Sequence, residues 1–182
     1  MNLEDYSFSY LEKINQHINS LDYKKFNQLL KSFLSVKKNK KKIILVGNGG
    51  SAAMASHVSV DLTKVVGIRA VNFNEADLIT CFVNDYGQDN WIKEAISKYY
   101  DPGDLVVLIS SSGNSKNHIV AANFCKKKKI KLVTFTGFSG LNKLSKLGNI
   151  NLFLNSSNYN QIEMTHHIWL LLLCDYILKV KF

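Results

Sequence analysis

The sequence predicts an α/β fold, in which a parallel sheet lies between two layers of helices as a three-layer αβα sandwich. Short runs of wholly apolar residues alternate along the chain with segments of helical periodicity, which is the pattern of repeated βαβ units. Strands of a parallel sheet are covered on both faces, so they are apolar throughout. The 182 residues contain no Pro-rich or Gly/Ser-rich linker, so we expect a single domain over residues 1–182.

Each expected element follows from its local pattern. Apolar residues at helical spacing predict two N-terminal helices, over residues 3–21 and 26–34. Five apolar runs predict the strands, at residues 43–46, 70–73, 105–109, 132–135 and 150–154. A helix over residues 116–127 follows the third run, and a long helix over residues 160–180 ends the chain.

The formal net charge of +9 raises the question of nucleic-acid binding. Much of the excess lies in two lysine-rich runs, residues 37–42 and 126–129, and each run precedes an expected strand. Lysine is favoured at the C-terminal end of a helix by the helix dipole. Neither run contains the arginines or aromatic residues that are usual in nucleic-acid sites. Solvated helix ends are therefore the favoured interpretation, and a nucleic-acid patch is the alternative.

The cysteines and the apolar stretches bear on cellular location. Cys81, Cys125 and Cys174 are widely spaced and odd in number, which is typical of reduced thiols in a cytoplasmic protein. The first residues are polar and acidic, unlike a secretory signal. The most apolar stretch, residues 168–174, is far shorter than the roughly 20 residues of a membrane span. We expect a cytoplasmic protein with no membrane contact.

The residues after the first expected strand form a glycine loop, defined as residues 47–51 and containing Asn48, Gly49, Gly50 and Ser51. Glycines let the backbone turn sharply and approach a ligand, and the N–H groups at the start of the next helix then face an anion. The loop matches neither GxGxxG nor a Walker sequence, so no nucleotide cofactor is expected. A purely structural turn is the alternative to a ligand site.

The residues after the third expected strand form a serine loop, defined as residues 110–115. Its four hydroxyls belong to Ser110, Ser111, Ser112 and Ser115. Hydroxyls and backbone N–H groups at a helix N-terminus bind a phosphate without a lysine or a metal. One serine would be enough for a helix cap, which is the alternative. The carboxyl ends of parallel strands are where ligands bind, so the two loops together predict a site for a phosphorylated sugar.

Three motifs, taken in order, resemble the sugar isomerase (SIS) domain family and, within it, the phosphoheptose isomerases. They are the glycine loop with residues 52–61, the segment at residues 84–87 that reads Asn-Asp-Tyr-Gly, and the serine loop. The resemblance covers essentially the whole chain. It implies a five-stranded parallel sheet and a homotetramer with active sites at subunit interfaces. It also implies interconversion of sedoheptulose 7-phosphate and an aldoheptose 7-phosphate, for lipopolysaccharide or capsule synthesis.

The resemblance assigns ligand-binding roles position by position. It implies that the four serines of the serine loop hold the phosphate, and that Asn48, Ser51 and Asp85 contact the sugar or its neighbours. Phosphoheptose isomerases of this kind bind zinc through four residues on two helices. A histidine and a glutamate lie on the helix after the glycine loop, and a glutamine and a second histidine lie on the last helix. The glutamate and the second histidine also form the acid–base pair. Here these four positions read His57, Asp61, Glu163 and Leu171.

Leu171 departs from the family pattern, because leucine neither moves a proton nor binds a metal. His57 and Asp61 are four residues apart, as are Glu163 and His167, so each pair lies on one helix face. If the two helices face each other, these four residues would form a zinc site. The alternative is that the histidines only pack or hydrogen-bond locally.

Three residues are candidates for the acid–base chemistry of an aldose–ketose isomerase. Asp61 is the first candidate for the base and Glu163 the second, since isomerisation through an enediol needs a base within hydrogen-bond reach. His166 is a candidate acid if the site is built across subunits. The alternative function is a non-catalytic SIS module that binds a sugar phosphate, with a regulatory role or a role associated with replication initiation. The change at Leu171 favours this alternative.

Overall fold

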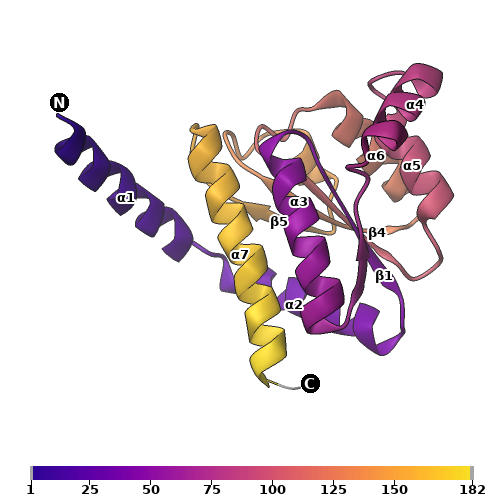
Figure 1. Cartoon of the computed structure of the whole chain (residues 1–182), viewed down its shortest axis with the longest axis horizontal. Helices are drawn as coiled ribbons and strands as arrows, with labels where there is room; N and C mark the ends of the chain where they lie inside the picture. The colour runs from indigo at the N-terminus through magenta and orange to yellow at the C-terminus, as the bar shows by residue number, and fades with distance from the viewer. Residues whose placement is uncertain (1, 181–182) are drawn as a thin grey trace.

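The computed structural model describes residues 2–180, and its centre is a five-stranded parallel sheet between two layers of helices (Figure 1). The strands lie in the order β2-β1-β3-β4-β5, and every neighbouring pair is parallel. The strands are β1 (Lys42–Gly47), β2 (Arg69–Val71), β3 (Leu105–Ser110), β4 (Lys131–Thr136) and β5 (Ile150–Phe153). The predicted α/β class and the five strands are confirmed.

The helices form the two outer layers, with α2, α3 and α7 on one face of the sheet and α4, α5 and α6 on the other. They are α1 (Leu3–Asn19), α2 (Tyr23–Lys38), α3 (Gly50–Asp61), α4 (Ala76–Tyr86), α5 (Trp91–Tyr99), α6 (Lys116–Lys127) and α7 (Tyr159–Val180). A short π-helix (Leu62–Val66) continues α3, and a 3₁₀ turn (Leu144–Lys146) precedes β5. The two N-terminal helices and the long last helix agree with the sequence.

Strand β1 illustrates why the expected strands are mainly apolar. Ile43 and Leu45 pack into the apolar cluster shared with α2, α3 and α7. Ile44 and Val46 point to the opposite face and pack with α5 and α6. All four side chains are 0% exposed. Both faces of the strand therefore need apolar residues, which is the condition for a central parallel strand.

Strand β2 is shorter than the sequence predicts, because it ends at Val71. The next residues turn toward α3 instead of continuing along β1. Asn72 donates from Nδ2 to Ser59 Oγ (2.9 Å), and Asn74 donates from Nδ2 to the carbonyl oxygen of Ala52 (2.6 Å). Side-chain bonds of this kind compete with a strand ladder.

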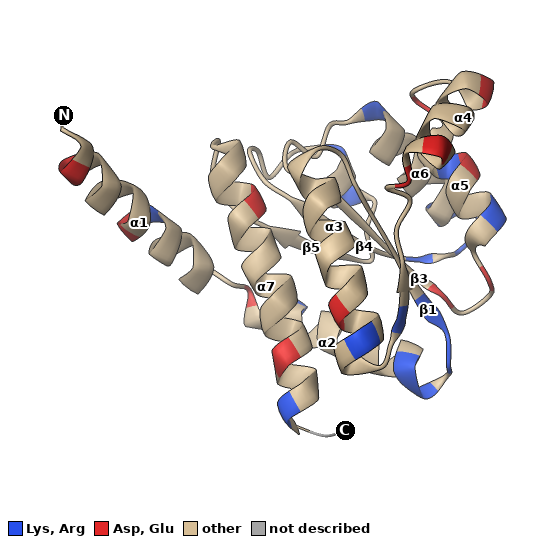
Figure 2. Ribbon diagram, viewed as in Figure 1, with Lys and Arg blue, Asp and Glu red and all other residues tan. Residues whose placement is uncertain are grey.

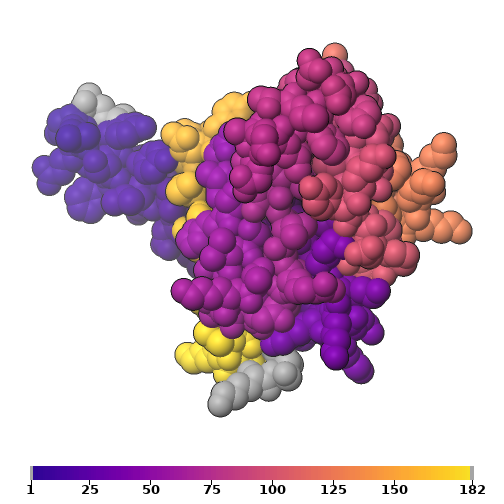
Figure 3. Space-filling model, turned by 45° about the vertical axis from the view of Figure 1, so that its right-hand side comes forward, coloured from indigo at the N-terminus to yellow at the C-terminus, as the bar shows by residue number. Residues whose placement is uncertain are grey.

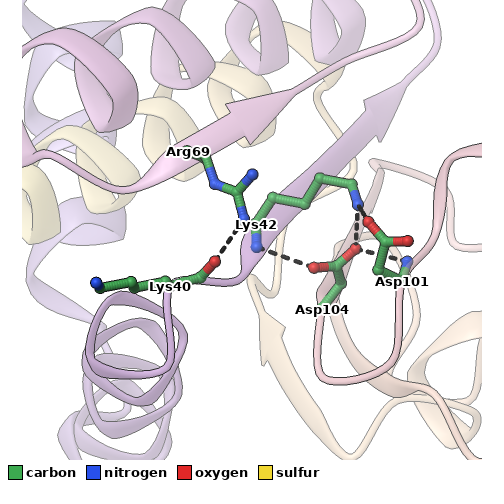
Figure 4. A network of polar contacts seen from close by, with 5 residues as sticks. All are labelled: Lys40, Lys42, Arg69, Asp101 and Asp104. Carbon is green, nitrogen blue, oxygen red and sulfur yellow. Dashed lines mark hydrogen bonds and ion pairs between the residues drawn. The ribbon is translucent and has the colours of Figure 1, made fainter.

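A polar network joins the N-terminal ends of β1, β2 and β3 (Figure 4). The Lys42 ammonium pairs with Asp101 and Asp104, and the Lys42 backbone N–H donates to Asp104 Oδ1 (2.9 Å). Arg69 donates to the carbonyl oxygen of Lys40. Burial acts to lower the pKa of Lys42, but its bonds to the two aspartates outweigh burial and raise it. The last lysine of the first basic run is thus paired and only 13% exposed, whereas the sequence suggested a solvated helix end.

Helix α1 extends away from the rest of the molecule (Figures 1 and 3). Its first turns expose apolar side chains: Leu3 is 80% exposed and Phe8 is 70% exposed. Only its C-terminal end is attached, where Trp169 Nε1 donates to the carbonyl oxygen of Ile18 (3.0 Å). No helix within residues 2–180 is long and apolar enough to cross a lipid bilayer.

Candidate functional site

The two polar loops meet at the carboxyl ends of β1 and β3, as expected, and enclose a cavity of about 60 Å³. We call this cavity the cradle. Five of the expected ligand-binding residues line it, namely Asn48, Ser51, Ser110, Ser111 and Ser112. His118, Tyr159 and Glu163 also line it, from α6 and α7. Among residues 2–180, no lysine or arginine does so.

The glycine loop needs its glycines for two different reasons. Gly49 has a φ of +54°, which disfavours other residues. A Cβ atom on Gly50 would lie 2.1 Å from Glu163 Oε2, so Gly50 lets α7 bring its carboxylate close to the start of α3. Ser51 follows within the first turn of α3 and is 2% exposed. The loop therefore aims the N-terminal end of α3 at the cradle.

The serine loop supplies hydroxyls that are not used for helix capping. Ser110 Oγ lies 3.2 Å from Ser115 Oγ, and Ser115 caps α6 through its backbone without a side-chain bond. Within residues 2–180, the buried Ser111 hydroxyl has no hydrogen-bond partner of good geometry. Buried polar groups are normally paired. An unused hydroxyl at a helix N-terminus fits a site whose ligand provides the missing partner.

Glu163 is the one carboxylate that lines the cradle among the described residues. Its Oε1 atom lies 3.5 Å from Ser51 Oγ. Burial raises the pKa of Glu163, and the Ser51 hydroxyl, together with the nearby Ser111 hydroxyl, opposes this shift. A carboxylate with a raised pKa is suited to accept and return a proton near neutral pH.

Asp61 is the last residue of α3 and lies at the far end of this helix from the glycine loop. Figure 2 shows α3 beside α7, with acidic residues in red. Ten residues separate Asp61 from Ser51, which corresponds to roughly 15 Å along the helix. Asp61 instead lies beside His57, with 3.6 Å between Oδ2 and Nε2. The structure therefore does not bring Asp61 to the cradle of its own chain, and its role as a base stays a prediction.

His57 and His167 form a pair between α3 and α7. Nδ1 of His57 lies 3.0 Å from Nε2 of His167, and the rings meet edge to face. Burial and the neighbouring His57 lower the pKa of His167, and Asp61 acts in the opposite direction. The sequence correctly placed these residues on facing helices.

Comparisons with known proteins agree with the fold and the two loops. The profile of the family described as "SIS domain" matches residues 8–137. The chain belongs to the SIS domain family. A phosphoheptose isomerase from Sulfurimonas denitrificans is 31% identical, over 97% of this chain and 92% of that protein. A phosphoheptose isomerase from Buchnera aphidicola is 35% identical, over 72% of this chain and 70% of that protein.

The solved structures support the same assignment. A phosphoheptose isomerase from Francisella tularensis superimposes with a TM-score of 0.89 at 26% identity, covering 100% of both chains. These three similar proteins are phosphoheptose isomerases, and the resemblance seen in the sequence is confirmed.

The zinc site expected from the SIS family does not assemble from the residues present. The Glu163 carboxylate lies beside Ser51 and Gly50 instead of joining the histidine pair. Leu171 packs against the apolar cluster of α2, α3 and α7. No group of three or more His, Cys, Asp or Glu side chains within residues 2–180 is arranged to hold a metal ion. The set His57, Asp61, Glu163 and His167 does not fit zinc, because its members face two different neighbourhoods.

His166 does not fit the expected role of an acid. It is 0% exposed and lies between the rings of Phe135 (5.4 Å) and Trp169 (5.7 Å). Burial lowers its pKa to about 3, although the Thr136 carbonyl favours the charged form. His166 itself faces the sheet through Phe135 of β4, so this histidine is part of the core.

Asp85 lies outside the cradle, in the last turn of α4. It is exposed and accepts hydrogen bonds from two neighbours on its own helix, Asn84 Nδ2 (2.9 Å) and Cys81 Sγ (3.8 Å). The structure therefore does not bring it to the ligand-binding loops of its own chain.

Two residues directly after the serine loop were missed from the sequence. Asn117 exchanges two hydrogen bonds with Asn48 (3.1 and 3.2 Å), and His118 lines the cradle. The signal was present, since amide and imidazole groups in the first turn of α6 lie close to any anion held by the loop before them.

Proposed function

We propose that this chain is a sugar-phosphate isomerase that interconverts sedoheptulose 7-phosphate and an aldoheptose 7-phosphate. The observation that carries the proposal is the cradle, where serine hydroxyls and a helix N-terminus lie next to the Glu163 carboxylate. The chain's membership of the SIS domain family supports the same function. Relatives named phosphoheptose isomerase support the choice of substrate. The product would serve heptose synthesis for lipopolysaccharide or capsule.

The chemistry requires one proton to move between adjacent carbons. A base removes a proton from C1 of the ketose, the electron pair forms the enediol, and the proton returns to C2, while a proton passes from the oxygen on C1 to the oxygen on C2. Glu163 is the candidate for this base, because it lines the cradle and burial raises its pKa. The serine loop would hold the phosphoryl group through Ser110, Ser111, Ser112 and Ser115.

The size of the cradle supports a site shared between subunits. A volume of about 60 Å³ accommodates a phosphoryl group but not a whole seven-carbon sugar. The remainder of the sugar would extend past the loops, where a second copy of the chain could cover it. We therefore propose a homotetramer with active sites at subunit interfaces, in which Asp85 and the group of His57, Asp61 and His167 lie against a neighbour's ligand.

An isomerase assay tests the proposal. Purified protein is incubated with sedoheptulose 7-phosphate, and the aldose product is followed by NMR. The Glu163→Gln variant keeps the shape of the side chain and removes the base, so turnover should fall by roughly 10² or more. Lys25→Met, at an exposed position of α2, is the matched control and should leave turnover unchanged. Equal turnover in the Glu163→Gln variant would remove Glu163 from the mechanism.

The second candidate is a non-catalytic module that binds a sugar phosphate. Leu171 and Asp61 favour it, since two positions of the family's acid–base chemistry carry a different residue in this chain. Tight binding of sedoheptulose 7-phosphate with no turnover by the parent protein would support this candidate and exclude the isomerase.

A further inference from the structure

The proposed chemistry leaves the imidazole of His118 without a role. This side chain lies in the first turn of α6, directly behind the serine loop, and it is 0% exposed. It also lines the cradle. In a buried histidine next to a ligand site, the ring nitrogen that carries the proton decides which neighbouring group the ring can orient.

The hydrogen bonds of Asn117 determine the tautomer of His118. Oδ1 of Asn117 accepts the backbone N–H of His118 (3.0 Å), so this atom is the oxygen of the amide and not its nitrogen. The same oxygen lies 3.1 Å from Nδ1 of His118, which therefore carries the proton. Burial lowers the pKa of His118 to about 4, although the carbonyls of Val46 and Ile109 favour the charged form. The ring is neutral at pH 7, and its contact with Asn117 Oδ1 is made through Nδ1.

Asn117 connects His118 to the glycine loop. Its Nδ2 atom donates to Asn48 Oδ1 (3.1 Å), and Asn48 Nδ2 donates back to Asn117 Oδ1 (3.2 Å). Oδ1 of Asn117 thus accepts three hydrogen bonds, two of them from His118. The amide pair joins the start of α6 to the loop that follows β1, across the cradle.

Histidine is a costly residue at this position. Within residues 2–180, its Nε2 atom is buried and has no hydrogen-bond partner of good geometry. A buried polar atom without a partner lowers stability, and leucine would fill a similar volume without that loss. What histidine adds is the N–H at Nδ1, which orients the Asn117 amide.

We propose that His118 is a positioning residue, which holds the glycine loop at a fixed distance from the serine loop through the Asn117–Asn48 amide pair. The width of the cradle, and hence the fit of the phosphoryl end of a sugar phosphate, depends on this contact. The inference rests on the proposed function for the identity of the ligand.

A double-mutant cycle tests the inference. The dissociation constant for sedoheptulose 7-phosphate and the melting temperature are measured for the parent, His118→Leu, Asn48→Ala and the double variant. His118→Leu should weaken binding about tenfold, as expected for a lost buried hydrogen bond, while its melting temperature stays equal or rises. In the Asn48→Ala background, His118→Leu should cause no further loss of affinity. His118→Asn, whose amide nitrogen replaces Nδ1, should recover most of the affinity.

The possible failures are distinguishable. Three outcomes would each overturn the role of His118 while leaving the isomerase proposal intact. They are unchanged affinity in His118→Leu, additive losses of affinity in the double-mutant cycle, and a fall in melting temperature that parallels the loss of affinity. A parent protein that binds no sedoheptulose 7-phosphate would refute the proposed function and this inference together.

Discussion

The carboxylate of Glu163 lies 3.5 Å from the hydroxyl of Ser51, at the N-terminal end of α3. A negative group thus already lies where the helix dipole and the free N–H groups favour an anion. In the proposed function, Glu163 would therefore be the base beside a sugar phosphate and also a competitor of its phosphoryl group.

The Glu163→Gln variant should separate these two effects. Removing the negative charge should tighten binding of sedoheptulose 7-phosphate about tenfold, which is the effect of roughly 1.4 kcal/mol of like-charge repulsion, while turnover falls. Because the pKa of Glu163 is raised, the parent should lose affinity as the pH rises through that pKa and the carboxylate ionises. The variant should lack this component in a calorimetric pH titration. Parallel pH profiles for the two proteins would contradict the electrostatic account.

Gly50→Ala should move the Glu163 side chain without unfolding the protein. The added Cβ would lie 2.1 Å from Glu163 Oε2, and this atom is at the end of a flexible side chain that can rotate away. We expect a melting temperature within a few degrees of the parent and a clear loss of turnover. In a Glu163→Ala background the overlap is absent, so Gly50→Ala should be neutral or raise stability by up to about 1 kcal/mol. Urea denaturation of the parent, the two single variants and the double variant gives the free energy of unfolding of each protein. The effect of Gly50→Ala on this free energy is then compared between the two backgrounds.

Local sequence patterns predict the sheet and the two loops, because each depends on a few consecutive residues. The apolar run that became β1 and the hydroxyls of the serine loop needed no knowledge of distant contacts. The direction of a side chain on a helix is different, since it depends on the partner across the interface. Glu163 and His167 are one turn apart on α7, yet Glu163 turns toward Ser51 and His167 toward His57.

Burial explains why the sequence did not separate the roles of His166 and His167. The sequence shows two adjacent histidines on α7 and does not indicate which one faces the core. His166 packs against Phe135, whereas His167 is only partly buried. The distance between Asp61 and the glycine loop follows from the sequence, since ten residues of helix separate Asp61 from Ser51.

Lys42→Met should be among the more destabilising substitutions outside the apolar core. Asp104 is 1% exposed in its pair with Lys42, so the variant leaves a buried carboxylate without its cation, a change that costs about 3–5 kcal/mol. The pKa of Lys42 is raised above 10.5, so this stabilisation should be present at neutral pH and be lost only as the pH rises through the raised value. Urea denaturation at pH 7 measures the loss. Lys25→Met, which removes an exposed pair with Asp22, is the control and should change stability by less than about 1 kcal/mol.

Zinc should not copurify stoichiometrically with the protein, because the donor set does not come together. We expect metal analysis of chelator-free protein to give far less than one zinc per chain, and we expect the His57→Ala and His167→Ala variants to give the same content as the parent. Treatment with EDTA should leave the melting temperature unchanged. One zinc per chain that disappears in either histidine variant would show that the two helices rearrange around a metal.

The exposed apolar side of α1 should be buried in the assembled protein. Leu3, Phe8 and Leu11 are 80%, 70% and 64% exposed, on a helix that is attached only at its C-terminal end. Exposed apolar residues grouped in this way typically mark an interface. Phe8→Lys with Leu11→Lys should therefore lower the mass measured by light scattering from that of a tetramer to that of a smaller species, without changing the far-UV circular dichroism. Glu12→Lys, which adds positive charge to the same helix without removing an apolar side chain, is the control. A parent protein that is monomeric at micromolar concentration would show that α1 has another partner and that the cradle works within one chain.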